Sequence, residues 1–165
     1  MKSEFTEVWF ENGVEITGTH KTVNLPFKRA SARALIVRRG DGAILGTLHR
    51  EGGHFALPGG AIEDGESSAE AVKRELAEEH IRLIEPGVSW EKRVGLDYFE
   101  GYRELSIWHI FDVKDASIGV SEENLESRWV GQEEEIWYPF MHQKIILLIN
   151  QFLPNLAVKR LVVEK

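Results

Sequence analysis

The sequence predicts a protein of mixed α/β class, because strand-like and helix-like segments alternate along 165 residues with no linker between them. Residues 32–38 contain a continuous apolar run, which is typical of a buried strand. Residues 67–85 open with a helix-capping pattern, and residues 139–153 form a strongly apolar helix. A chain of this length buries a real core, so we expect a single domain over residues 1–165.

The remaining segments fit the same class. Residues 5–18 contain Asn12-Gly13 between two short β-prone stretches, which predicts an N-terminal hairpin. Four other segments have strand-like composition: residues 43–50, 90–99, 103–113 and 125–131. The C-terminal tail, residues 154–165, alternates only weakly and fits a late strand, a docking arm or a loose end.

The first predicted helix has clear boundaries. Ser67 and Glu70 have the spacing of a capping box, and Pro86 requires the helix to end at or before residue 85. Helical periodicity predicts a buried stripe of four residues. They are Ala69, Val72, Leu76 and Ala77.

Composition restricts the classes of function and location. The net charge of −7 disfavours binding to long nucleic acid, which requires Lys and Arg against phosphates, but it does not exclude a small phosphorylated substrate. The chain has no cysteine and therefore no disulfide or thiolate metal site. We find no signal peptide and no apolar run long enough to cross a membrane, so a cytoplasmic location is expected.

The segment RELAEEH, residues 74–80, crowds three acidic side chains onto one part of a helix. Residues three and four apart are neighbours on a helix, so Glu75, Glu78 and Glu79 repel one another. Two charges about 6 Å apart repel by roughly 3 kcal/mol at an effective dielectric constant of about 20. Either water screens these acids, as on an ordinary solvated face with an Arg74–Glu78 pair, or a cation lies among them.

The spacing of residues around this segment resembles the Nudix box, the loop-helix signature of the Nudix hydrolases. The family pattern is Gly, five residues, Glu, seven residues, and then Arg-Glu-aliphatic-any-Glu-Glu-any-Gly-aliphatic. The matching residues are Gly60, Glu66, Arg74, Glu75, Leu76, Glu78 and Glu79. The preceding FALPGG, residues 55–60, also resembles the segment that leads into the box. The resemblance implies an α/β/α sandwich of the Nudix type with a mixed β-sheet.

The resemblance ends at the last two positions of the box, residues 60–82. The family has Gly and an aliphatic residue where this chain has Ile81 and Arg82. Gly often lets the chain leave a helix in a left-handed conformation, which a β-branched residue resists. We therefore expect the helix to continue for another turn, towards Leu83 or Ile84.

The resemblance also implies roles for individual residues. Glu75, Glu78 and Arg74 are the expected catalytic residues, with Arg74 holding a box glutamate in place. The expected ligands of Mg²⁺ or Mn²⁺ are Glu75, Glu78, Glu79 and the carbonyl of Gly59, because hard cations prefer oxygen. Glu66 would reach the metal through water or brace the loop.

Further roles are expected outside the helix. Arg50 and Gly60 would contact substrate phosphates. The family often places a catalytic base on a loop outside the box, for which three residues are candidates. They are Glu122, Glu123 and Glu126.

The function that the resemblance implies is hydrolysis, dependent on Mg²⁺ or Mn²⁺, of the diphosphate linkage in a nucleoside diphosphate joined to another group. The alternative is a non-catalytic nucleotide-binding sensor or regulator on the same fold. A homodimer is possible, as is common in the family. Other polar and aromatic residues fit structural roles better. His80 is expected to be a helix-end residue, Tyr98 a strand residue, and Trp90, Trp108 and Trp129 core residues.

Overall fold

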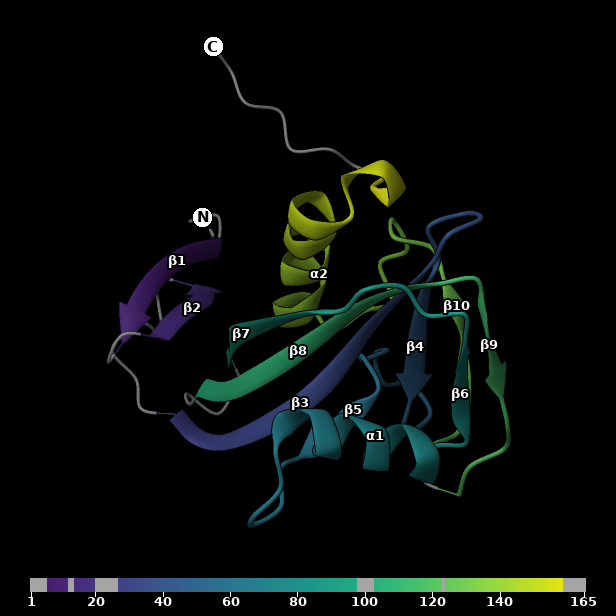
Figure 1. Ribbon diagram of the computed structural model, residues 1–165, viewed down its shortest axis with the longest axis horizontal. Coiled ribbons are helices and arrows are strands. Elements are labelled where there is room, and N and C mark those ends of the chain that lie inside the picture. Colours follow the sequence, from purple (N-terminus) through teal and green to yellow (C-terminus); the bar gives the residue numbers. More distant parts are fainter. Residues whose placement is uncertain (1–5, 12–13, 20–26, 98–102, 123, 159–165) are drawn as a thin grey trace.

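The computed structural model describes residues 6–11, 14–19, 27–97, 103–122 and 124–158 (Figure 1). Its two α-helices are α1 (Ser68–Glu78) and α2 (Pro139–Phe152), and a short 3-10 helix, η1 (Pro154–Leu156), follows α2. The strands of the large sheet are β1 (Thr6–Glu11), β2 (Val14–Thr19), β3 (Phe27–Arg38), β4 (Ile44–Leu48), β5 (Gly59–Ala61), β7 (Trp90–Asp97), β8 (Arg103–Val113) and β10 (Glu126–Val130). A second, small sheet pairs β6 (Ile81–Ile84) with β9 (Asp115–Ile118).

The large sheet is mixed, as the resemblance to the Nudix family implied. Its strand order is β1-β2-β7-β8-β3-β4-β10, and β5 pairs with β3 beside this path. β3 runs parallel to β8, whereas it runs antiparallel to β4 and β5. β1 and β2 form the antiparallel pair expected near the N-terminus, although their turn at Asn12-Gly13 lies outside the described residues.

The two helices cover opposite faces of this sheet, which gives the expected three layers (Figure 1). Successive side chains of a strand point to opposite faces, so β3 serves both cores. Leu35 and Val37 pack in the cluster under α2, whereas Ala34 and Ile36 pack in the cluster under α1. Each large aliphatic side chain buried in this way contributes about 1.5–3 kcal/mol.

α1 begins where the sequence predicted. Ser67 is the N-cap, its hydroxyl accepts a hydrogen bond from the backbone N–H of Glu70, and the Glu70 carboxylate accepts one from the backbone N–H of Ser67. The capping box is therefore confirmed in both directions. A cap of this kind contributes about 1 kcal/mol to the stability of a helix.

The buried face of α1 differs from the predicted stripe. Ala69 and Ala77 are exposed, whereas Ala71 is buried together with Val72 and Leu76. With about 100° between successive residues, positions 75 and 79 fall between 71 and 76 around the helix. The stripe was predicted wrongly because it assumed an apolar centre, and the centre of the inward face is occupied by glutamates.

The expected extension of α1 is wrong. The helix ends at Glu78, with Glu79 as its C-cap, and Ile81 begins β6. His80 takes the left-handed conformation, with φ of 56°, one position before the Gly of the family pattern. Ile81 is therefore free to be extended, and it is 5% exposed. His80 is a helix-end residue, as predicted.

Of the predicted aromatic core residues, Trp108 is fully buried. Trp90 packs against Phe152 of α2, with ring centroids 5.7 Å apart, and Trp129 packs against the cluster under α1. Tyr98 lies outside the described residues. Within the described residues, no helix is long and apolar enough to cross a membrane.

Candidate active site

The loop before α1 is pressed against β3. Gly59 pairs with Arg33 in the β3–β5 ladder, and the N–H of Ala34 donates to the carbonyl of Pro58 over 2.9 Å. Gly59 has a φ of 148°, and a Cβ at this position would collide with the Ala32 carbonyl and lie 2.7 Å from the Arg33 Cα. The approach of this loop to the strand therefore requires glycine.

Gly60 lies directly against the carboxylate of Glu75. A Cβ at Gly60 would be only 2.5 Å from Glu75 Oε1. The side chain of Glu75 is 12% exposed, in keeping with its place on the inward face of α1. The second glycine therefore brings the loop backbone next to a predicted metal ligand.

Arg74 is one cation that lies among the crowded acids. Its Nε and Nη2 donate to the two carboxylate oxygens of Glu66 over 2.8 and 3.0 Å, and its Nη1 donates to Glu75 Oε1 over 2.9 Å. Nη2 also donates to the Ala61 carbonyl over 3.0 Å. The Arg74–Glu78 pair of the solvated-face interpretation is present but longer, at 3.4 Å. One guanidinium thus joins the loop to the helix.

These contacts fix the charge states of the pair. The hydrogen bonds from Arg74, followed by one from the backbone N–H of Glu63, lower the pKa of Glu66 below its ordinary value. The hydrogen bond to Glu66 raises the pKa of Arg74 in turn. Glu66 is therefore a carboxylate that braces the loop, the second of the two roles considered for it.

The two expected principal ligands have different surroundings. The Glu78 side chain is 43% exposed, whereas the whole Glu79 residue is 1% exposed. Glu79 Oε1 accepts a hydrogen bond from Asn124 Nδ2 over 3.2 Å. Asn124 lies on the loop between β9 and β10. Burying a carboxylate costs free energy unless donors or a cation face it, so this contact matters for Glu79.

Two of the three candidate loop bases, Glu122 and Glu126, have different surroundings. Glu122 is exposed, Glu126 pairs with Arg128 over 3.0 Å, and Glu123 lies outside the described residues. Sequence reasoning missed Asn124, because it searched the loop for carboxylates only. No spacing rule in the sequence marks an amide as the partner of a box glutamate.

Arg50 lies in the tight turn after β4, where its carbonyl accepts a hydrogen bond from the N–H of Gly53 over 3.1 Å. Its side chain is exposed. The neighbouring Leu48 pairs with Glu126 and accepts a hydrogen bond from the N–H of Leu125 over 2.8 Å. Arg50 therefore follows the end of β4 that lies beside the start of β10, where the loop that carries Asn124 joins the sheet.

The donors at this site fit a hard divalent cation. The carboxylates of Glu75, Glu78 and Glu79 and the carbonyl of Gly59, which the sequence predicted as ligands, are oxygen donors of the kind that Mg²⁺ and Mn²⁺ prefer. Among the described residues, however, no three acidic or histidine side chains converge as a ready-made cage. Arg74 holds the Glu75 carboxylate. The chemistry of the donors fits, and side-chain rearrangement would accompany binding.

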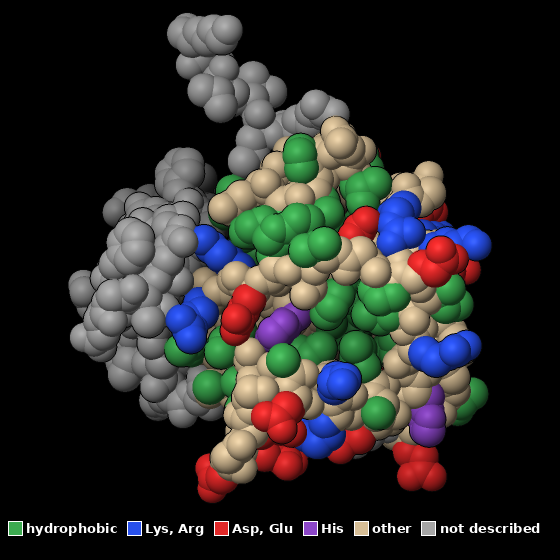
Figure 2. Space-filling view, viewed as in Figure 1, with side chains coloured by type: hydrophobic (Ala, Val, Ile, Leu, Met, Phe, Trp, Pro, Cys, Tyr) green, Lys and Arg blue, Asp and Glu red, His purple; other side chains and the backbone are tan. Residues whose placement is uncertain are grey.

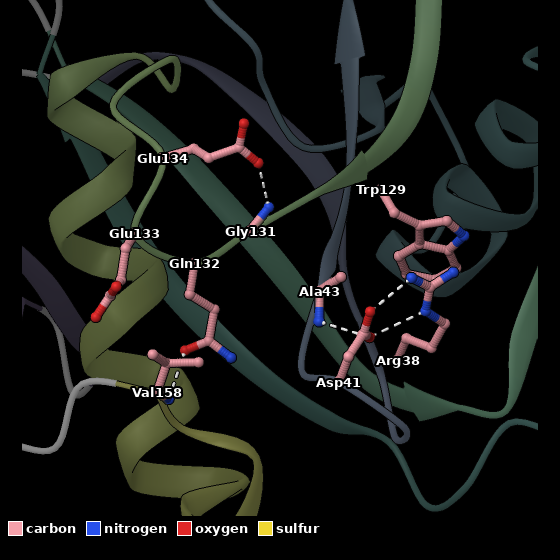
Figure 3. Close-up of a pocket in the computed structure, with 9 residues that line it drawn as sticks. All are labelled: Arg38, Asp41, Ala43, Trp129, Gly131, Gln132, Glu133, Glu134 and Val158. Atoms are coloured by element: carbon pink, nitrogen blue, oxygen red, sulfur yellow. Dashed lines mark hydrogen bonds and ion pairs between the residues drawn. The ribbon is translucent and has the colours of Figure 1, made fainter.

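A pocket elsewhere on the molecule involves none of these residues (Figure 3). It lies beside the β3–β4 turn and the end of β10. The guanidinium of Arg38 lies over the Trp129 ring, 4.6 Å from its centroid, and binds both oxygens of Asp41. The Arg38 hydrogen bond lowers the pKa of Asp41 to about 2. The charges of Arg38 and Asp41 are therefore paired with each other across two hydrogen bonds.

Comparison with known proteins places this site in a family. The NUDIX domain model matches residues 19–149. No curated protein matches the sequence. The structure is similar to that of a MutT protein from Methanosarcina mazei Go1, with a TM-score of 0.58 and 26% identity, covering 78% of this chain and 97% of that one.

Two less similar structures share the fold. One is a C. elegans Ap4A hydrolase, with a TM-score of 0.56 and 20% identity over 76% of this chain and 98% of that one. The other is a bifunctional NMN adenylyltransferase/ADP ribose pyrophosphatase from Francisella tularensis, complexed with AMP and a manganese ion. Its TM-score is 0.56 and its identity 21%, over 79% of this chain and 43% of that one. Because the family model spans most of the sequence, the chain belongs to the Nudix family, and it is a Nudix hydrolase.

Proposed function

We propose that this protein is a pyrophosphohydrolase, dependent on Mg²⁺ or Mn²⁺, that cleaves the diphosphate linkage of a nucleoside diphosphate joined to another group. The observation that carries the proposal is the placement of the Glu75 carboxylate against Gly60, with Arg74 beside both. Two relatives of similar fold are an Ap4A hydrolase and an ADP ribose pyrophosphatase, and the second holds manganese. Both names describe compounds with a phosphoric anhydride.

The glutamates of α1 would hold the ion through Glu75, Glu78 and Glu79, together with the Gly59 carbonyl. When bound, the ion neutralises phosphate charge and makes a bound water more acidic. Gly59 and Gly60 let the loop lie close to β3 and to the Glu75 carboxylate, so a diphosphate bound at this loop would lie beside the ligands of the ion. Arg50, exposed at the same edge, would contact phosphate oxygens.

The reaction consumes one water molecule. Its oxygen forms a bond to one phosphorus of the diphosphate while the bridging P–O bond breaks, and the bridging oxygen leaves with the second phosphate. Glu75 would accept the proton of the attacking water, because its carboxylate lies next to the loop that receives the diphosphate. Arg74 would keep that carboxylate ionised and oriented.

A substrate screen tests the proposal. The purified protein is incubated with nucleotide sugars, ADP-ribose, dinucleoside polyphosphates and nucleoside triphosphates, each with Mg²⁺ or Mn²⁺, and the products are separated by chromatography. We expect hydrolysis of at least one class, dependent on the added ion. Glu78→Gln and Glu79→Gln should each lower the rate by at least 100-fold while the circular dichroism spectrum stays unchanged.

Glu133→Gln is the matched control, because Glu133 is an exposed acid that lines the separate pocket. It removes the same charge and should retain the wild-type rate. Equal turnover by wild type and both box variants would reject the assigned roles. Nucleotide binding measured by calorimetry, with no product from any compound, would favour the sensor or regulator.

A further inference from the structure

We propose that Asn124 is a positioning residue that completes the ion site of α1 from outside the box, an inference that rests on the proposed metal-dependent function. Its amide N–H group donates a hydrogen bond to the carboxylate of Glu79, and its amide oxygen provides a further oxygen ligand beside that carboxylate. The loop between β9 and β10 would then contribute a neutral amide to the site, where the sequence led us to expect a carboxylate.

The first support is the contact itself. Asn124 Nδ2 donates to Glu79 Oε1 over 3.2 Å, and Glu79 is 1% exposed. A hydrogen bond to a buried carboxylate is stronger than one between neutral groups at the surface. Since Glu79 is also the C-cap of α1, this bond fixes a ligand at the point where the helix ends.

The second support is that the loop is held in place on both sides of Asn124. The hydroxyl of Ser121 donates to the Glu78 carbonyl over 3.4 Å, and the N–H of Leu125 donates to the Leu48 carbonyl over 2.8 Å. The first bond connects the loop to the last turn of α1, and the second connects it to the last residue of β4. These two contacts therefore position the amide of Asn124 next to Glu79.

The third support is the other atom of the amide. Asn124 Oδ1 is buried and has no hydrogen-bond partner among the described residues. Leaving a buried acceptor unsatisfied costs about 1–3 kcal/mol, which the structure would recover if a ligand faced that atom. An amide oxygen is a hard ligand for divalent cations, and it also accepts hydrogen bonds from waters bound to such a cation.

The two described acids near Asn124 do not replace it. Glu126 is paired with Arg128 over 3.0 Å, and Glu122 is exposed. An aspartate at position 124 would supply an oxygen ligand but no hydrogen-bond donor for Glu79. It would also place a second negative charge against Glu79. An asparagine is compatible with Glu79 both before and after the ion binds.

Manganese binding without substrate tests the assignment. Free Mn²⁺ is measured by electron paramagnetic resonance during titration of the wild type, Asn124→Leu, Asn124→Asp and the control Asn155→Leu, which alters an exposed asparagine in η1. Removing a partner that orients a metal ligand typically weakens metal binding about 10- to 100-fold. We expect that loss for Asn124→Leu, and wild-type affinity for Asn155→Leu.

Asn124→Asp separates the proposed role from a merely structural one. Its carboxylate returns an oxygen to the site, so its Mn²⁺ affinity should equal or exceed that of the wild type, while its melting temperature in EDTA should fall. Wild-type affinity in Asn124→Leu, or equal weakness in both variants, would overturn the assignment. If Asn124→Leu does not fold, Asn124→Ala takes its place. A wild-type protein that binds no Mn²⁺ would instead overturn the proposed function, and this inference with it.

Discussion

Gly59 and Gly60 serve the site in different ways, and the difference is visible only in their surroundings. At Gly59, backbone atoms exclude a side chain, since the Ala32 carbonyl and Arg33 Cα occupy the space of a Cβ. At Gly60, the space of a Cβ is occupied by the carboxylate of Glu75, which belongs to a side chain that can move. A side chain at Gly59 would therefore disturb the fold, whereas one at Gly60 would displace the Glu75 carboxylate.

Gly59→Ala should lower the free energy of unfolding. Its φ of 148° is unfavourable for alanine, at about 1–3 kcal/mol, and the collision with β3 adds to this cost. Gly65→Ala is the matched control, because Gly65 has a φ of 79° but nothing within 4 Å of its Cβ position. Strain alone predicts a loss of about 1–2 kcal/mol there. Urea unfolding of both variants measures the difference, and equal losses would contradict the predicted collision.

The sequence predicted those residues of this site that stand at fixed positions of the family pattern. Arg74 was expected to hold a box glutamate, and it binds Glu66 and Glu75. Asn124 could not be found in this way, because the four strands β6 to β9 separate it from Glu79 in the sequence, and the two residues meet only once the chain has folded. A contact between residues 45 positions apart in the sequence leaves no local pattern.

At the scale of elements, local signals placed the start of α1 and failed at its end. The capping box is complete within four residues, so the sequence contains it entirely. The end of the helix depends instead on β9, because the N–H of Gly119 donates to the His80 carbonyl over 2.8 Å. The small sheet of β6 and β9 was missed for the same reason, since its strands pair across 31 or more residues.

His80→Gly should stabilise the protein. His80 has a φ of 56°, a conformation that costs a residue with a side chain about 1–2 kcal/mol, and the greater freedom of glycine in the unfolded chain offsets part of that gain. We expect the free energy of unfolding to rise by about 0.5–1 kcal/mol in thermal or urea unfolding.

Ile81→Gly, which restores glycine at the position of the family pattern, should have the opposite effect. Ile81 is extended and 5% exposed, so the change removes a buried side chain and should cost more than about 2 kcal/mol. If glycine stabilised the protein at position 81 and not at 80, the helix would end one residue later than the structure shows.

At the scale of the whole molecule, charge is distributed so that acids gather at α1 and the loop before it. Figure 2 shows red side chains along the lower edge of the molecule, with blue ones among them. Acids gathered at this place repel an anionic substrate, and the divalent cation proposed above would reverse that field when bound. The core on both faces of the sheet was implied by the resemblance to the Nudix family, whereas this charge arrangement required the positions of the elements.

One polar contact joins three elements beneath the start of α1. The Ser68 hydroxyl, at the first position of α1, donates to Glu91 of β7 over 3.0 Å and lies 2.9 Å from Nε2 of His109, on β8. A hydroxyl has one hydrogen, so the imidazole Nε2–H is the donor of the second bond. His109 is 9% exposed, and burial lowers its pKa although the nearby Glu91 acts in the opposite direction.

The stability of the protein should consequently decline as the pH falls below the ordinary histidine pKa of 6.5. The unfolded chain then binds a proton that the buried imidazole resists, so the full stability is present above pH 6.5 and is lost towards the lower pKa of the folded state. His109→Gln should flatten this slope in urea unfolding between pH 7.5 and 5, because an amide can keep the bond to Ser68 without titrating. His54→Gln, at an exposed histidine, should keep the wild-type slope. An unchanged slope in His109→Gln would show that the protonation of other groups controls stability in this range.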